Sequence, residues 1–161
     1  MSAPEKDYWK LENSIGYLTR LAFRSYSALI ERRTRKYGVT VGQWRFLRQL
    51  WVEDGITQRE LSTRVGMREP TTVVALRGLI KSNLVYRKPS QTDRRKMHVY
   101  LTDHARELQS LLSDVSGEVN ELATRDFTDA EVDTLRKLLQ RAIDNMAEEA
   151  AELPPVRDTR A

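Results

Sequence analysis

The segment from Arg87 to His98 has the residue types and spacing that bind an anion. It carries five cations against the single acid Asp93, whereas the whole chain of 161 residues has a formal charge of only +4. Guanidinium and ammonium groups gathered on a short segment bind phosphate oxygens, and they are not a catalytic arrangement. The placement of the cations, more than their total, therefore favours nucleic acid as the partner.

Few residues could support catalysis or hold a metal ion. Cysteine is absent, which excludes disulfides, thiol nucleophiles and thiolate metal sites. The sequence has no Gly-rich phosphate loop, no nucleophile elbow and no carboxylate pair on an element expected to line a cleft, so we predict no enzyme and no cofactor. The two histidines, His98 and His104, would need carboxylates such as Asp103 or Glu107 to bind a metal. Contact with the basic segment or with a ligand is the simpler role for His98.

The elements that position the basic segment follow from apolar spacing and helix caps. Apolar residues at intervals of three and four predict one long helix over residues 11–36, ended by Gly38. Thr40 caps a second helix over residues 41–51, and Gly55 follows it.

The next two helices are short and lie on either side of a turn. Thr57 and Glu60 form a capping box for a helix that reaches residue 65. After a tight turn at Gly66, a further helix has Pro70 in its first turn and ends near Asn83, a residue that tolerates the left-handed conformation of a C-cap.

A hairpin and a helical C-terminal part complete the pattern. The β-prone runs 84–88 and 96–101 predict two paired strands, and the charged loop between them should protrude as a wing. Thr102 caps a long helix that continues to Leu122, and a second capping box at residues 128–131 begins the last helix.

A short helix, a glycine turn, a second helix and a basic hairpin, in this order, predict a winged helix-turn-helix in a mainly α fold with a small β-hairpin. Two packed helices with no role in DNA binding remain the alternative. The second helix would enter the major groove of DNA, and its candidate contacts are Arg68, Glu69, Pro70, Thr71, Thr72, Val74, Arg77 and Lys81. The wing candidates are Arg94, Arg95 and Lys96, of which one arginine would enter the minor groove and the other would pair with Asp93.

These segments resemble the multiple antibiotic resistance regulator (MarR) family of winged-helix repressors over most of the chain. The resemblance rests on Val39-Thr40-Val41-Gly42-Gln43-Trp44, Thr57-Gln58-Arg59-Glu60-Leu61-Ser62, Leu84-Val85-Tyr86-Arg87, and Asp93-Arg94-Arg95 followed by Val99-Tyr100-Leu101-Thr102-Asp103. It implies that Asp93 and Arg95 anchor the wing, that Arg94 lies at its tip, and that residues 68–77 present the base-reading surface.

The sequence departs from the family pattern at a few positions. Asn83 and Ala105 stand where relatives commonly have Gly. Val73, Val74 and Gly78 occupy positions that are often Thr and Arg, so a customary polar contact with DNA is missing and the base preference is open.

The resemblance also implies a homodimer joined by its first and last helices, which binds a pseudo-palindromic operator in double-stranded DNA. We accordingly expect an N-terminal dimerisation helix (1–38), a DNA-binding domain (39–102), C-terminal dimerisation helices (103–150) and a flexible tail (151–161). A charged N-terminus and the lack of a long apolar run predict no signal peptide and no membrane association, hence a cytoplasmic protein.

Many relatives are released from DNA by a small aromatic acid, a phenol or a related thioester. An aromatic-walled pocket with cations for such a ligand is expected from Tyr17, Arg20, Phe23, Arg24, Trp44, Trp51 and His98. The alternative is that the aromatic residues belong to the core and the arginines to a solvated face. Two other functions stay open: a winged-helix protein-interaction module, and a regulator that responds to no small molecule.

Overall fold

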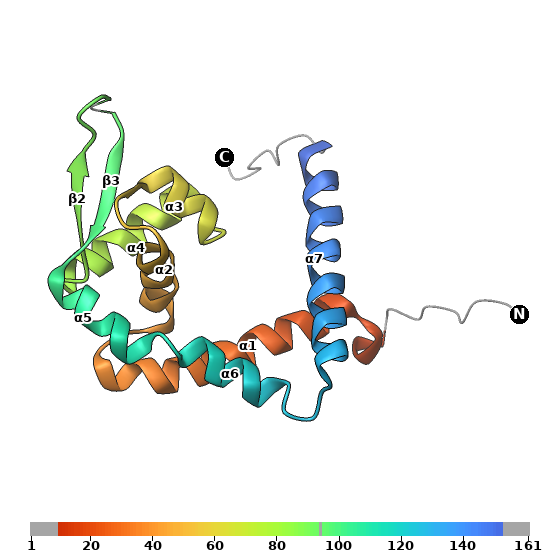
Figure 1. The fold of residues 1–161 in the computed structure, drawn as a ribbon. Helices are drawn as coiled ribbons and strands as arrows, with labels where there is room; N and C mark the ends of the chain where they lie inside the picture. Colours follow the sequence, from red (N-terminus) through yellow and green to blue (C-terminus); the bar gives the residue numbers. More distant parts are fainter. Residues whose placement is uncertain (1–9, 94, 153–161) are drawn as a thin grey trace, which may run out of the picture. The chain divides into compact units, whose positions relative to one another are not determined.

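The computed structural model describes residues 10–93 and 95–152 and contains seven α-helices and three strands among them (Figure 1). The elements are α1 (Ile15–Thr34), α2 (Val41–Val52), β1 (Ile56–Thr57), α3 (Gln58–Arg64), α4 (Glu69–Lys81), β2 (Val85–Pro89), β3 (Met97–Leu101), α5 (Asp103–Leu112), α6 (Val115–Ala123) and α7 (Asp129–Glu152). Two 3₁₀ turns, Leu11–Asn13 and Arg35–Tyr37, flank α1. The chain divides into two compact units at Val119. The predicted fold class, a mainly α winged helix-turn-helix, is confirmed.

The helix boundaries of the helix-turn-helix follow the predicted caps. The side chain of Thr40 accepts a hydrogen bond from the backbone N–H of Gln43, and Thr57 does the same for Glu60. In both cases the side chain of the same residue, Gln43 or Glu60, accepts a hydrogen bond from the backbone N–H of the cap threonine. These bonds satisfy backbone N–H groups that the start of a helix leaves unpaired. Asn83 has a φ of 54°, the left-handed conformation expected where α4 gives way to β2.

Two predicted helices differ from those observed. The single helix over residues 11–36 is interrupted at Ser14, which ends a 3₁₀ turn and caps α1 by accepting from the N–H of Tyr17 at 3.3 Å. The long helix predicted to run from Thr102 to Leu122 is broken at Ser113 and Asp114 into α5 and α6. Serine and aspartate favour breaks because their side chains compete for backbone hydrogen bonds. The apolar spacing does not indicate this break, because the buried residues Leu112 and Val115 on either side of it keep the helical interval of three.

The sheet has the order β1-β3-β2 and is antiparallel. The predicted hairpin is confirmed, with Val85 opposite Leu101 and Lys88 opposite His98. The strand β1 was missed, because two residues are too short to show an alternating pattern. It pairs with β3 beside the hairpin and thereby fixes the start of α3 against the sheet.

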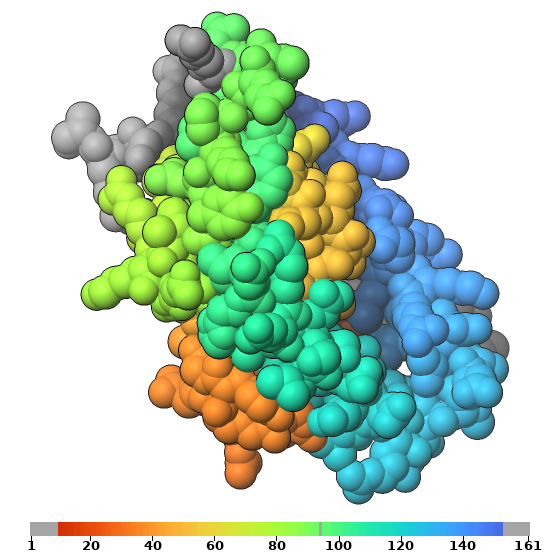
Figure 2. Space-filling view, turned by 60° about the vertical axis from the view of Figure 1, so that its left-hand side comes forward, coloured from red at the N-terminus to blue at the C-terminus, as the bar shows by residue number. Residues whose placement is uncertain are grey.

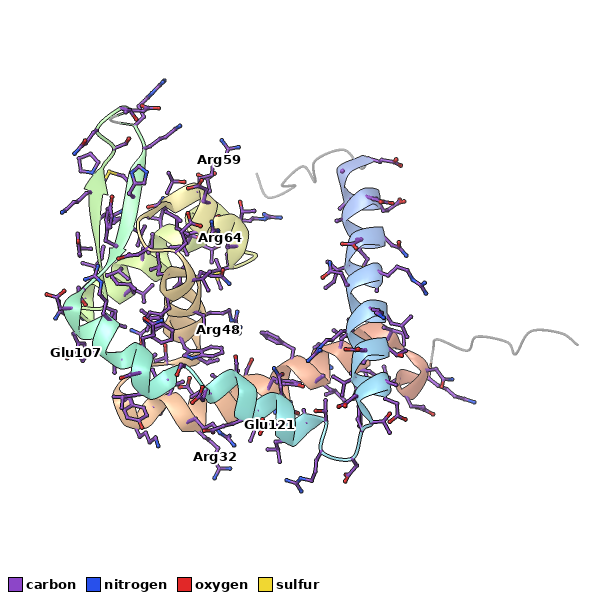
Figure 3. The ribbon with its side chains drawn as sticks, viewed as in Figure 1. Arg32, Arg48, Arg59, Arg64, Glu107 and Glu121 are labelled. Atoms are coloured by element: carbon purple, nitrogen blue, oxygen red, sulfur yellow. The ribbon has the colours of Figure 1, made fainter. Side chains whose placement is uncertain are left out.

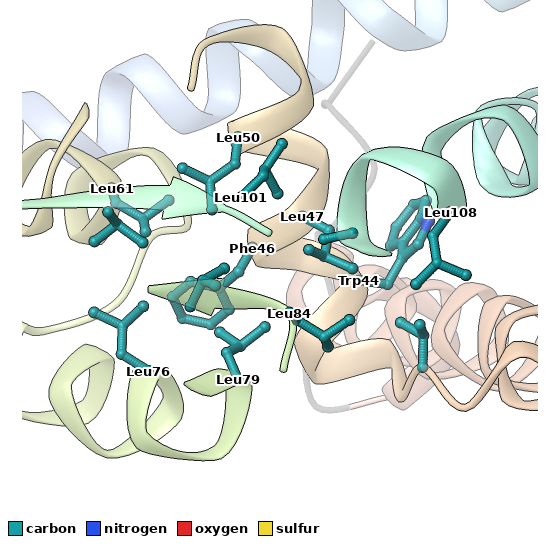
Figure 4. Close-up of a cluster of buried hydrophobic side chains, with 14 of the residues drawn as sticks. Trp44, Phe46, Leu47, Leu50, Leu61, Leu76, Leu79, Leu84, Leu101 and Leu108 are labelled. Atoms are coloured by element: carbon teal, nitrogen blue, oxygen red, sulfur yellow. The ribbon is translucent and has the colours of Figure 1, made fainter. Parts of the chain in front are cut away.

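One core holds the helix-turn-helix to the sheet (Figure 4). Phe46, Leu47 and Leu50 of α2 lie at its centre and are almost fully buried. Leu61 of α3, Leu76 and Leu79 of α4, and Leu84 and Leu101 of the sheet region surround them. Because Leu76 and Leu79 are 0% exposed, one face of α4 is fixed inward and the opposite face must lie on the surface.

The helix α7 belongs to the second unit and has no buried residue. Five of its large apolar side chains are exposed, and they are Leu135, Leu138, Leu139, Ile143 and Met146. No helix in residues 10–93 and 95–152 is long and apolar enough to cross a membrane.

Candidate nucleic-acid interface

The outward face of α4 carries most of the predicted DNA contacts. Its exposed residues are Arg68, Glu69, Pro70, Thr71, Val74, Arg77 and Lys81. Thr72 must be removed from the predicted set, because its side chain is 0% exposed and lies on the same helical face as Leu76 and Leu79. A side chain fixed in the core cannot reach a base without moving the helix.

The charges on this face differ in their pairing. Glu69 lies 3.7 Å from the guanidinium of Arg59 on α3. No ion pair is found for Arg68, Arg77 or Lys81 in the part of the chain that the structure describes. These three cations are therefore available to phosphate oxygens or base edges. Figure 3 shows Arg59 and Arg64 projecting from α3, where Arg64 bonds to Glu53.

An apolar groove of about 680 Å³ lies between α2 and α4. We call it the α2–α4 groove; its lining is Thr40, Gly42, Gln43, Phe46, Met67, Pro70, Thr71, Val74, Ala75, Gly78 and Leu79. Gln43 connects the two helices, because its Nε2 donates to the hydroxyl of Ser82 at 2.9 Å while its Oε1 accepts from the N–H of Thr40 at 3.0 Å. The groove was not foreseen from the sequence, since it depends on how two helices are spaced.

The wing, drawn in green, lies at the top of the view above α4 (Figure 2). Its turn is closed by the N–H of Ser90, which donates to the carbonyl of Lys96 at 2.8 Å, and by the N–H of Lys96, which donates to the carbonyl of Asp93 at 2.9 Å. The carboxylate of Asp93 accepts from Arg95 through the backbone N–H at 3.1 Å and the side-chain Nε at 3.3 Å. Arg95 and Lys96 are exposed, so their charges can face DNA. Arg94, the predicted tip residue, lies outside the described residues.

The base of the wing contains a residue that the sequence analysis missed. Asp54, between α2 and β1, accepts from the N–H of Leu101 at 2.8 Å with Oδ1 and from Arg106 at 2.7 Å with Oδ2. The hydrogen bond that Arg106 donates to Asp54 raises the pKa of Arg106, and Asp103 accepts a second bond from Arg106 at 2.9 Å. The local sequence Asp54-Gly55 is typical of an ordinary turn. The partners of Asp54, Leu101 and Arg106, are distant in sequence and can be identified only from the fold.

The seven predicted ligand-binding residues are divided among α1, α2 and β3. Trp44 is 3% exposed within the core, and the indole N–H of Trp51 donates to the carbonyl of Ala105 at 3.0 Å. His98 lies in β3, with its ring 6.4 Å from that of Tyr100. The rings of these three residues therefore make contacts within the fold.

The remaining four predicted ligand residues lie on α1. The guanidinium of Arg20 is 5.1 Å from the ring of Tyr17, while Phe23 is 55% exposed beneath the guanidinium of Arg45 from α2 at 5.0 Å. Arg24 is exposed nearby in sequence. No group of three side chains suited to a metal ion is found among the described residues.

Comparisons with known proteins place this geometry in context. The MarR family model matches residues 39–97, which span α2 to the start of β3. The chain is 28% identical over 147 residues to the HTH-type transcriptional regulator SarZ of Staphylococcus epidermidis, covering 86% of this chain and 98% of SarZ. These similarities are to transcriptional regulators, which agrees with the prediction that the chain is not an enzyme.

Solved structures show the same fold. A MarR transcriptional regulator from Methanosarcina mazei is similar with a TM-score of 0.75 and 28% identity, covering 83% of this chain and 96% of that one. The structure of a MepR–DNA complex from S. aureus is similar with a TM-score of 0.77 and 20% identity, covering 82% of this chain and 98% of that one. The resemblance predicted from the wing and cap motifs is therefore confirmed.

Proposed function

We propose that the protein is a transcriptional regulator that binds double-stranded DNA, because the MarR family model matches its winged helix-turn-helix. One observation carries the proposal: the exposed face of α4 has three cations without an ion pair in the described structure, beside a wing that exposes Arg95 and Lys96. A recognition helix in the major groove with a basic wing over the neighbouring minor groove uses all of these charges.

We further propose that the protein acts as a homodimer on a pseudo-palindromic operator. The support is the apolar surface that a single chain leaves exposed on α7 and on α1, where Ile15 and Leu18 are each at least 45% exposed. Exposed apolar surface of this extent is typical of an interface. Two recognition helices about one DNA turn apart, roughly 34 Å, would then read two half-sites. Such a dimer acts most simply as a repressor, because it occupies the duplex that polymerase needs.

The proposed effector is a small aromatic carboxylate, a phenol or a related aryl thioester that releases the protein from DNA. The residues that support it best lie where α1 meets α2, since Trp44 is buried in the core and Trp51 is partly buried. Phe23 offers an exposed ring, and Arg20, Arg24 and Arg45 have no carboxylate partner among the described residues. An aromatic face beside cations without ion pairs suits an aromatic anion.

Enrichment from a pool of random duplexes, followed by a salt titration, tests the function. A DNA-binding regulator enriches one sequence, and the logarithm of its affinity falls linearly with the logarithm of the salt concentration. Lys96→Ala should reduce that slope by about 1 if Lys96 binds a phosphate. Failure to enrich any duplex, with binding insensitive to salt, would instead indicate a protein-interaction module.

A further inference from the structure

The central part of the DNA-facing side of α4 is apolar. Thr71, Val74, Ala75 and Gly78 follow one another at helical spacing and line the α2–α4 groove. Val74 is 65% exposed, and a Cβ at Gly78 would meet no described atom within 4 Å outside its own helix backbone, so the groove is open at this end.

The groove is preformed. The hydrogen bonds of Gln43 connect the cap of α2 to Ser82 at the end of α4, and Phe46 and Leu79 in the groove wall are at most 1% exposed. The groove therefore keeps its width without a ligand. Arg68, Arg77 and Lys81, all on α4, place positive charge around an apolar centre. This combination is complementary to a polyanion that presents apolar groups, and less so to a neutral small molecule.

The major groove of DNA offers one apolar group among its base edges, the 5-methyl of thymine. Adenine, guanine and cytosine present hydrogen-bond donors and acceptors there, and covering them with a valine would remove water without replacing its hydrogen bonds. We propose that the α2–α4 groove reads thymine, with Val74 and the methyl of Thr71 in contact with thymine 5-methyl groups in each half-site. The proposal rests on the proposed function, since it names the bases that the recognition helix selects.

Deoxyuridine provides the test, because it differs from thymidine only by the methyl group. The full chain first enriches an operator from random duplexes, and each thymine of that operator is then replaced singly by deoxyuridine. We expect one or two positions per half-site at which the dissociation constant rises about fourfold, the value for one buried methyl. Failure to enrich an operator would count against the proposed function. An operator that tolerates every replacement would overturn the thymine assignment alone.

Two variants tie the effect to the groove. Val74→Ala should bind thymine and deoxyuridine equally at one of the sensitive positions, because its side chain no longer reaches the methyl. Ile80→Ala is the matched control, since Ile80 is an apolar residue of α4 that is 38% exposed and does not line the groove. It should keep the full discrimination. Equal discrimination in Val74→Ala and in the wild type would overturn the assignment.

Discussion

Asp54 Oδ2 accepts a hydrogen bond from the Arg106 guanidinium at 2.7 Å, across 52 positions of sequence. The other oxygen of Asp54 accepts from the backbone N–H of Leu101, the last residue of β3. One carboxylate therefore joins the end of α2, the base of the wing and the helix that follows it. These hydrogen bonds therefore help to fix the position of the wing relative to α4.

Replacing Asp54 by Asn should weaken DNA binding while preserving the fold. The amide keeps the shape of the side chain but loses the charge that holds Arg106. We expect roughly a fivefold loss of affinity, as for one hydrogen bond of typical strength, measured by fluorescence anisotropy with unchanged helical circular dichroism. Asp103→Asn is the control, because Asp103 also bonds Arg106 but is 98% exposed and has no bond to the wing. Equal effects of the two changes would refute a role for Asp54 in holding the wing.

Gly55 should tolerate a side chain less well than Gly66. Both have positive φ, 77° and 68°, so alanine at either position costs about 1 kcal/mol in backbone strain. A Cβ at Gly55 would also lie 2.6 Å from Tyr100 Cε1, whereas none of the described atoms lies within 4 Å of a Cβ at Gly66. The Tyr100 ring is stacked on that of Tyr86 at 5.4 Å and cannot move without breaking this contact. Urea unfolding should therefore show Gly55→Ala to be less stable than Gly66→Ala by about 1–3 kcal/mol. If the two variants have nearly equal free energies of unfolding, the Tyr100 ring can move aside at little cost.

Local signals in the sequence predicted much of this fold because they act within a few residues. The caps at Thr40 and Thr57 are satisfied by residues three positions away, and the left-handed Asn83 needs no distant partner. The hairpin followed from its alternation and flanking turns.

The features that sequence reasoning missed depend on distant contacts. Thr72 and Trp44 could each have faced solvent or a ligand by helical spacing, and only packing against other elements shows that they are buried. The partners of Asp54 are separated from it by about fifty residues, and β1 exists because β3 pairs with it. The α2–α4 groove likewise depends on the distance between two helices.

The capping box of α3 should make stability fall in acid. Hydrogen bonds from the hydroxyl and the backbone N–H of Thr57 lower the pKa of Glu60 below its ordinary value. A carboxyl with a lowered native pKa contributes stability that is complete above the unfolded pKa and is lost as the pH falls through the native one. Glu60→Gln should therefore reduce the decline of the melting temperature between neutral and strongly acidic pH. Glu107→Gln is the control, since no described residue bonds to that side chain. If the melting temperature of Glu60→Gln falls with pH as much as that of the wild type, the cap is not the source of the acid sensitivity.

The exposed stripe on α7 should determine the oligomeric state. Leu135, Leu138, Leu139 and Met146 lie on one side of the helix, and none has a buried environment within its own chain. Leu138→Glu would place a charge in a dimer interface, where it would have to lose its water. Sedimentation equilibrium at micromolar concentration should then show a monomer, against a dimer for the wild type.

Lys137→Glu separates the interface from a general effect of charge on α7. Lys137 lies on the side of the helix opposite Leu135, Leu139 and Met146, so the variant should remain dimeric although its charge changes by more. If the dimer is needed to bind both half-sites, Leu138→Glu should also lose at least about 100-fold in operator affinity, because the second half-site no longer benefits from tethering. A Leu138→Glu protein that is monomeric but keeps wild-type affinity would show that one chain suffices for DNA binding. A protein that stays dimeric would instead place the interface outside this stripe.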